Sequence, residues 1–181
     1  AVKWHRMAAA QGHADAQYSL GICFFEGDHV NQSFTEAIKW YQLAAAQADT
    51  QAQFNLGSYH LQVRHDHKEA IKWFKMAGVS GEARAQYLIG QCLYHGKDGV
   101  PQDNQEAFKW LRMASYQGIA QAQYLFGMLL AGNHDGVKQD KSEAVKWWRI
   151  SAEHGFDLSQ HTIGVCFADG NGVKQDKSEA V

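Results

Sequence analysis

Hydrophobic and polar residues follow two recurring patterns along this chain. One type of segment carries its apolar residues at Ile38, Trp40, Tyr41, Ala44 and Ala45. A second type carries them at Ala52, Phe54, Leu56, Gly57 and Leu61. Both spacings place the apolar side chains on one face of an α-helix. The pattern therefore predicts an all-α fold built from two alternating kinds of amphipathic helix.

The two helices return at a regular interval. The tetrapeptide Ala-[Val/Ile/Phe]-Lys-Trp occurs five times, with tryptophans 36, 33, 37 and 37 residues apart. A central glycine marks the second helix and recurs with the same steps, at Gly21, Gly57, Gly90, Gly127 and Gly164. Each tetrapeptide Ala lies 20 residues before the next central glycine, whereas the return takes 13 to 17 residues. The constant segment predicts two packed helices joined by a tight turn, and the variable one predicts a surface loop.

Helix ends can be predicted from short motifs. A Ser or Asp followed three residues later by Glu is typical of a capping box, in which the first side chain accepts a backbone N–H and the Glu reaches back. The five instances are Ser33–Glu36, Asp66–Glu69, Asp103–Glu106, Asp140–Glu143 and Asp176–Glu179. Gly12, Gly81, Gly118 and Gly155 stand where C-terminal caps are expected. Ala48 takes this place once, so we expect a less well-defined turn there.

The packing between helices leaves two further signals. A mid-helix glycine costs about 1 kcal/mol relative to alanine, so its recurrence indicates that another helix approaches closely. We expect its small counterparts to be Ala8, Ala44, Ala77, Ala114 and Ser151. The tryptophans Trp4, Trp40, Trp73, Trp110 and Trp147 hold one fixed phase on the amphipathic side, which favours a core role over a ligand cage. The lysine before each Trp is expected to pair with the Glu three residues earlier, on a solvated face.

Each repeat is thus a pair of antiparallel helices of about 36 residues, which buries its apolar face only against neighbouring repeats. We predict one solenoid over residues 1–181. Its full repeats are 13–48, 49–81, 82–118 and 119–155, and its partial repeats are 1–12 and 156–181. The half repeats at both ends predict a piece of a longer chain, exposed apolar surface and a tendency to associate end to end.

The pattern Ala-x-x-Trp-x-x-x-Ala-Ala-x-x-Gly, then Ala-x-x-x-Leu-Gly, then Gly-x-Gly-Val-x-x-Asp resembles the Sel-like repeat, a relative of the tetratricopeptide repeat. Its best copies are Ala107–Gly118 with Ala122–Gly127, and Ala144–Gly155 with Gly170–Asp176. The second repeat departs from it, with Leu61–His67 in place of the Gly-rich loop. The resemblance implies a right-handed α/α superhelix that binds other proteins as a scaffold or adaptor, and it names no partner. Some family members are linked with β-lactam binding or hydrolysis, which makes such an enzyme the alternative.

Composition narrows the classes of function. The chain is 45% hydrophobic and 20% charged, which is typical of an ordered protein. Its net charge of −2 gives no basic footprint for nucleic acid, and no run of 18 apolar residues predicts a membrane span. Cys23, Cys92 and Cys166 share one phase two repeats apart, too far for a disulfide, so we predict buried thiols.

The motifs for chemistry are weak. His65-x-His67 could bind a transition metal, although a solvated loop explains the pair more simply. Gly90–Lys97 has five residues between its glycines, where a phosphate loop has four. Asp169–Asp176 lacks the alternating oxygen ligands of a calcium loop, so we predict a turn with glycines at positive φ. No serine is followed three residues later by lysine, as β-lactam hydrolysis usually needs. We therefore expect no catalysis, no metal and no cofactor.

Positions that vary between repeats on one face of the glycine-bearing helix indicate where a partner binds. By analogy with tetratricopeptide arrays, this helix lines the concave groove. The predicted partner-binding residues are Gln51, Asn55, Arg84, Leu88, Gln91, Gln121, Leu125 and Met128. We expect this surface to grade from polar in the N-terminal repeats to apolar around Leu88, Leu125 and Met128, which suits an extended peptide or a helix. Two alternatives stay open: burial of part of this face between repeats, and a structural spacer without a ligand.

Overall fold

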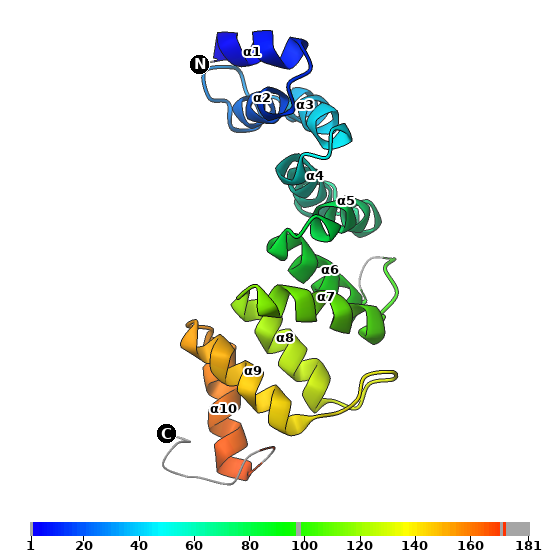
Figure 1. Cartoon of the computed structure of the whole chain (residues 1–181), viewed down its shortest axis with the longest axis vertical. Coiled ribbons are helices and arrows are strands. Elements are labelled where there is room, and N and C mark those ends of the chain that lie inside the picture. Colours follow the sequence, from blue (N-terminus) through cyan, green and yellow to red (C-terminus); the bar gives the residue numbers. More distant parts are fainter. Residues whose placement is uncertain (1, 97–98, 171, 173–181) are drawn as a thin grey trace. The chain divides into compact units, whose positions relative to one another are not determined.

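The described part of the chain is all-helical. The computed structural model describes residues 2–96, 99–170 and 172, and within these residues it has ten α-helices and no strand (Figure 1). The helices are α1 Val2–Ala10, α2 Ala14–Glu26, α3 Phe34–Ala46, α4 Thr50–Gln62, α5 His67–Val79, α6 Ala83–His95, α7 Asn104–Tyr116, α8 Ala120–Ala131, α9 Lys141–Glu153 and α10 Asp157–Asp169. The predicted all-α class is therefore confirmed.

Two compact units divide the chain. The first unit, Ala1–Glu82, holds α1 to α5, and the second unit, Ala83–Val181, holds α6 to α10. Odd-numbered helices carry the recurring tryptophan and are called Trp helices below, and even-numbered helices carry the central glycine and are called Gly helices. Each unit packs consecutive helices together, with α2 on α3 and α4 on α5 in the first, and α6 on α7 and α8 on α9 in the second. The predicted pairing is confirmed within each unit.

The predicted N-terminal caps are confirmed for one of their two hydrogen bonds. Ser33, Asp66, Asp103 and Asp140 each accept the backbone N–H of the Glu three residues later. The second predicted hydrogen bond, from the backbone N–H of the cap residue to the Glu side chain, was wrong. This N–H donates instead to a carbonyl oxygen of the preceding Gly helix, as Asp140 N does to Leu130 O at 2.8 Å. The freed Glu side chains pair with the lysine three residues later, as predicted; Lys72 Nζ lies 2.6 Å from Glu69 Oε2. Asp176–Glu179 lies outside the described residues.

The tight turns confirm four predictions and overturn one. Gly12, Gly81, Gly118 and Gly155 all take left-handed backbone conformations, with φ between 81° and 97°. Ala48 takes the same conformation, with φ of 64°, although a side chain disfavours it. Its turn closes as the others do, with Ala48 N donating to Ala45 O at 3.0 Å and Asp49 N to Ala44 O at 3.2 Å. The expectation of a less well-defined turn was wrong, because Ala48 keeps both the left-handed backbone and the closing hydrogen bonds of the glycine turns.

The central glycines confirm a close approach, but the predicted counterparts were wrong. A Cβ atom on Gly57 would lie 2.5 Å from the ring of Phe74. The opposing side chains are those one residue after the recurring Trp; they are Tyr41, Phe74, Leu111 and Trp148, opposite Gly21, Gly57, Gly90 and Gly127. The predicted counterparts Ala44, Ala77, Ala114 and Ser151 are also buried, and Ala8 is half-buried, but none of them supplies the atoms nearest to a central glycine. Removal of Cβ therefore makes room for a large side chain and, at Gly90, also for the backbone N of Leu111, which would lie 3.2 Å from such a Cβ.

Of the recurring tryptophans, Trp147 is buried, Trp40, Trp73 and Trp110 are half-buried, and Trp4 is exposed. Trp40 packs on the cluster of Ala9, Ala16 and Leu20, which precedes it in the chain. Trp147 is 7% exposed, whereas Trp4, which has no helix before it in this chain, is 68% exposed. The core prediction therefore holds in full for Trp147, in part for Trp40 and Trp73, which pack against buried clusters, and fails for Trp4.

A buried glutamine that sequence analysis missed links the helices through hydrogen bonds. It lies four residues before the central glycine, as Gln17, Gln53, Gln86 and Gln123. Gln53 Nε2 donates to Ala45 O in the preceding Trp helix at 3.3 Å. Gln86 Oε1 accepts from Gln117, which follows the Trp helix α7, at 2.8 Å. Ser80 stands at the corresponding place after α5 and is too short to reach, so Gln53 Oε1 has no partner among the described residues.

Candidate interaction surface

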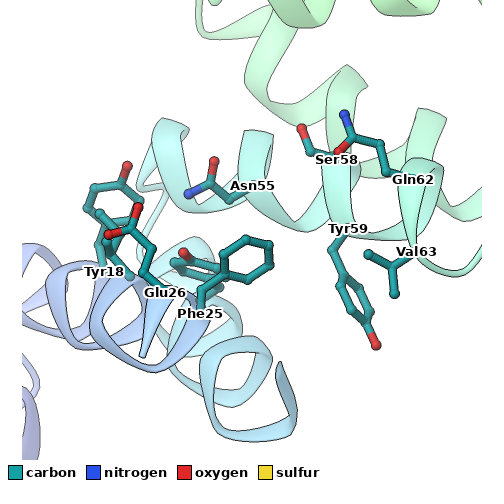
Figure 2. A pocket seen from close by; sticks show the side chains of 10 residues that line it. Tyr18, Phe25, Glu26, Asn55, Ser58, Tyr59, Gln62 and Val63 are labelled. Atoms are coloured by element: carbon teal, nitrogen blue, oxygen red, sulfur yellow. The ribbon is translucent and has the colours of Figure 1, made fainter. Parts of the chain in front are cut away.

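A pocket of about 300 Å³ opens between α2 and α4 in the first unit (Figure 2). It is called the α2–α4 pocket below. Its lining residues are Tyr18, Ile22, Phe25 and Glu26 of α2, Tyr41 of α3, and Asn55, Ser58, Tyr59, Gln62 and Val63 at α4 and its end. Both Gly helices therefore contribute their variable faces, and the Trp helix α3 contributes the side chain that fills the space beside Gly21.

Aromatic rings form the inner wall of this pocket. The ring centroids of Tyr18 and Tyr41 lie 5.9 Å apart, and those of Phe25 and Tyr41 lie 6.4 Å apart. Burial raises the pKa of Tyr41 to about 12, although a side-chain hydrogen bond with Asn55 acts in the opposite direction. The hydroxyl of Tyr41 is therefore neutral at any physiological pH. Tyr59 supplies a further ring from α4 (Figure 2).

Polar groups surround the mouth of the pocket. Asn55, Ser58 and Gln62 bring amide and hydroxyl groups from one side of α4, at the 3–4 spacing of one helical face. Glu26, the last residue of α2, is exposed and brings a carboxylate from the other side. The combination of rings and hydrogen-bonding groups is typical of a surface that binds a partner's side chain.

Sequence analysis placed two of its predicted residues in this unit. Asn55 lines the pocket, as do Ser58 and Gln62, which lie three and seven residues further along α4. Gln51 lies on the same helix but does not line it, and its Nε2 donates to Glu82 Oε2 at 3.0 Å. Asn55 therefore lines a cavity, and Gln51 does not.

The other six predicted residues lie in the second unit. Arg84 and Gln121 are exposed at the starts of α6 and α8, and Leu88 and Met128 are half-buried. Gln91 is also half-buried, and its Nε2 donates to the Tyr87 hydroxyl at 2.7 Å. Leu125 is 8% exposed and belongs to the core, so little of its side chain can meet a partner. A binding role for these six residues stays a prediction.

The sequence reasoning missed the aromatic part of the pocket. Tyr18, Phe25 and Tyr59 lie three before, four after and two after a central glycine, at positions that were not assigned to the variable face. In the N-terminal repeats, aromatic residues recur only at the first of these positions, as Tyr18 and Phe54, whereas Leu61 and Cys23 stand at the places of Phe25 and Tyr59 in the other repeat. Such residues are usually core, which is why their position at a cavity could not be recognised from spacing alone.

The cysteines and histidines give no second candidate site. Cys23, Cys92 and Cys166 are free and buried, as predicted, and burial raises the pKa of each thiol. His65 is exposed in the loop before α5, with a φ of 53°. In the described ranges no three His, Cys, Asp or Glu side chains come together as a metal site would require. None of the helices described is long and apolar enough to cross a membrane.

Comparisons with known proteins agree with the repeat pattern. The family model of the Sel1 repeat matches residues 1–13, 14–49, 50–78, 83–119, 120–156 and 158–181. The comparison with curated proteins gives no match.

Solved structures show the same fold. Over 99% of this chain, the structure is similar to a protective antigen of uropathogenic Escherichia coli strains that displays an SLR fold, with 31% identity and a TM-score of 0.90. The match covers 39% of that antigen, so the chain spans about two fifths of its length.

A Sel1 repeat protein from Oxalobacter formigenes is matched over 99% of this chain and 74% of its own, with 31% identity and a TM-score of 0.79. An immunity protein from Pseudomonas aeruginosa, 19% identical with a TM-score of 0.53, shares the fold over 99% of this chain and 65% of its own. The resemblance inferred from the residues is confirmed, and the chain belongs to the Sel1 repeat family.

Proposed function

We propose that this chain is a non-catalytic interaction scaffold that binds a peptide or a helix of a partner protein along the Gly helices α2 and α4. The observation that carries the proposal is the α2–α4 pocket, with its aromatic wall and polar mouth. Its volume of about 300 Å³ lies at the small end of ligand pockets, which suits one or two side chains of a longer segment. The remaining contacts of such a segment would run along the exposed helix faces.

The frame around the pocket supports this proposal because it is rigid. Tyr41 is 2% exposed and is held against Gly21, so the inner wall keeps its shape before a partner arrives. The cap at Asp49 fixes the start of α4, where its side chain accepts the N–H of Ala52 at 2.7 Å. A preorganised surface loses less conformational entropy on binding, which favours affinity.

The predicted residues of the second unit belong to the same proposal as an extension. Arg84 and Gln121 are exposed and offer polar contacts on α6 and α8. A second copy of the chain at its ends, where Trp4 is exposed, is a further partner that we expect at high concentration. Light scattering that shows a monomer up to millimolar concentration would exclude this self-association.

Selection from a random peptide library displayed on phage tests the binding function. We expect the immobilised chain to enrich peptides whose affinity falls at least tenfold in the variant Gln62→Arg, which places a long side chain at the pocket mouth. Gln42→Arg is the matched control, since Gln42 is exposed on α3 and does not line the pocket. Failure to enrich any peptide, or equal affinity for the two variants, would contradict the proposal.

A further inference from the structure

The charge distribution around the α2–α4 pocket is one-sided. Among the described residues that line it, Glu26 is the only one with a formal charge. Arg64 follows the lining residue Val63 along the chain but does not itself line the pocket. Figure 2 shows Glu26 and Tyr18 on the α2 side, with Tyr59 and Gln62 on the α4 side.

The C-terminal ends of α2 and α4 contribute partial charge of the same sign as the Glu26 carboxylate. Glu26 is the last residue of α2, and Gln62 is the last residue of α4. Backbone carbonyl groups at a helix C-terminus carry partial negative charge, which stabilises a cation placed nearby. Two helix C-termini and one carboxylate therefore favour positive charge at the mouth of the pocket.

Aromatic faces provide the second half of the chemistry. Tyr18, Phe25 and Tyr41 form one group of rings, with centroids 5.9 and 6.4 Å apart. A guanidinium or ammonium group within about 6 Å of such a ring is attracted by its negative face. The oxygens of Asn55, Ser58 and Gln62 can accept the N–H groups that such a cation donates.

From this arrangement we infer that the α2–α4 pocket receives a basic side chain, arginine or lysine, of the bound peptide, held between the aromatic rings and the Glu26 carboxylate. The inference rests on the proposed function and specifies its partner. An acidic side chain would be repelled by Glu26. An apolar side chain would leave the amide oxygens at the mouth without a hydrogen-bond donor.

The corresponding positions of α6 and α8 lack this chemistry. His95 stands where Glu26 stands, and Leu125 and Met128 stand where Asn55 and Ser58 stand. In α10 Asp169 and Thr162 do stand at the places of Glu26 and Asn55, so the carboxylate and the polar mouth are missing from the α6–α8 pair and not from the whole second unit. We expect basic peptides to bind at the α2–α4 pocket rather than along α6 and α8.

The peptides selected as described above supply the probe. We expect them to share an arginine or lysine whose replacement by citrulline or norleucine lowers affinity at least tenfold. In the variant Glu26→Gln, the same replacement should change affinity less than threefold, since the carboxylate partner is gone. Asp28→Asn is the matched control, because it removes one negative charge two residues away, outside the pocket, and should keep the tenfold difference.

A second pair of variants tests the rings. Tyr18→Phe keeps an aromatic face and should retain affinity within threefold, whereas Tyr18→Leu should lower it at least fivefold. Selected peptides that are sensitive to Gln62→Arg but carry no basic residue, or that bind Glu26→Gln as well as the wild type, would overturn this inference and leave the proposed function standing. A selection that yields no pocket-dependent peptide would instead overturn the proposed function.

Discussion

The Gly helices α4 and α8 occupy equivalent places in two repeats, yet one borders a pocket and the other closes a core. Asn55 and Tyr59 of α4 lie two before and two after the central glycine, and both are half-buried at the α2–α4 pocket. The same positions of α8 hold Leu125 and Leu129, which are 8% and 0% exposed. In that unit α8 also contacts α6, the equivalent of α2.

This contrast shows that one set of residues fixes the helix pairs and another set decides what occupies the space between the Gly helices. Caps, left-handed turns and central glycines recur in both units and fix the helix pairs. Two or three side chains per repeat then decide whether the space between Gly helices is filled by leucine or left open to solvent. A repeat protein can thus change its binding surface while its framework stays constant.

Exchanging the residue types at Asn55 and Leu125 should give the largest difference in stability between equivalent positions of the two units. Leu125→Asn places an amide in an apolar core, and we expect the free energy of unfolding to fall by about 3 kcal/mol. Asn55→Leu, at a half-buried pocket position, should change it by less than about 1 kcal/mol. Urea denaturation of both variants measures the difference, and similar losses for the two would show that the units do not differ as described.

The central glycines allow a smaller test of the shared frame. A Cβ atom at Gly57 would meet the Phe74 ring, and one at Gly127 would meet the Trp148 indole. Trp148 is also tied by a hydrogen bond from its Nε1 to Tyr124 O at 3.1 Å, so it can move less.

We therefore expect Gly127→Ala to lower the free energy of unfolding by about 2 kcal/mol and Gly57→Ala by about 1 kcal/mol. Denaturation of both variants beside Ser58→Ala, which fills no such space, supplies the control. A gain in stability from either glycine variant, as helix propensity alone predicts, would contradict the packing described.

The glutamine hydrogen bonds of the two units differ most at Ser80. Ser80 leaves Gln53 Oε1 without a partner among the described residues, whereas Gln117 satisfies Gln86 and His154 lies 3.0 Å from Gln123 Oε1. Ser80→Gln should supply the missing donor and raise the free energy of unfolding by about 1 kcal/mol, and Gln117→Ser should lower it by a similar amount. Thermal unfolding curves of the two variants test this directly, and no gain from Ser80→Gln would mean that solvent already satisfies Gln53.

The tight turns provide the smallest test. Ala48 and Gly118 share one backbone conformation, but only glycine adopts it without strain. We expect Ala48→Gly to raise the free energy of unfolding by about 0.5–1 kcal/mol and Gly118→Ala to lower it by about 1 kcal/mol. Ala46→Gly, in the last turn of α3, should be destabilising instead. Destabilisation by Ala48→Gly would show that its turn is not strained.

Much of the fold could be predicted because it depends on local chemistry. The Ser and Asp caps and the positive-φ glycines act on neighbouring backbone groups, so their motifs indicate helix ends directly. The 36-residue period is itself the sign of stacked helix pairs. Ala48 was mispredicted because the tertiary structure imposes the turn on a residue that disfavours it.

The contacts between helices could not be predicted in the same way. Which side chain lies opposite Gly57 depends on how α4 and α5 are rotated against each other, which a single sequence does not reveal. For the same reason the 3–4 spacing placed both Asn55 and Leu125 on one face, although their burial differs. The aromatic wall was missed because Tyr18 and Phe25 have the composition of a core.

The most direct test of the central claim is to locate the bound peptide by NMR. A selected peptide would be titrated into the ¹⁵N-labelled chain while the side-chain amide signals are followed. We predict saturable shifts of Asn55 and Gln62 at the α2–α4 pocket, with Gln121 on α8 shifting far less. Shifts confined to Gln121 and Gln91 in the second unit, with Asn55 and Gln62 unmoved, would contradict the assignment of the binding site.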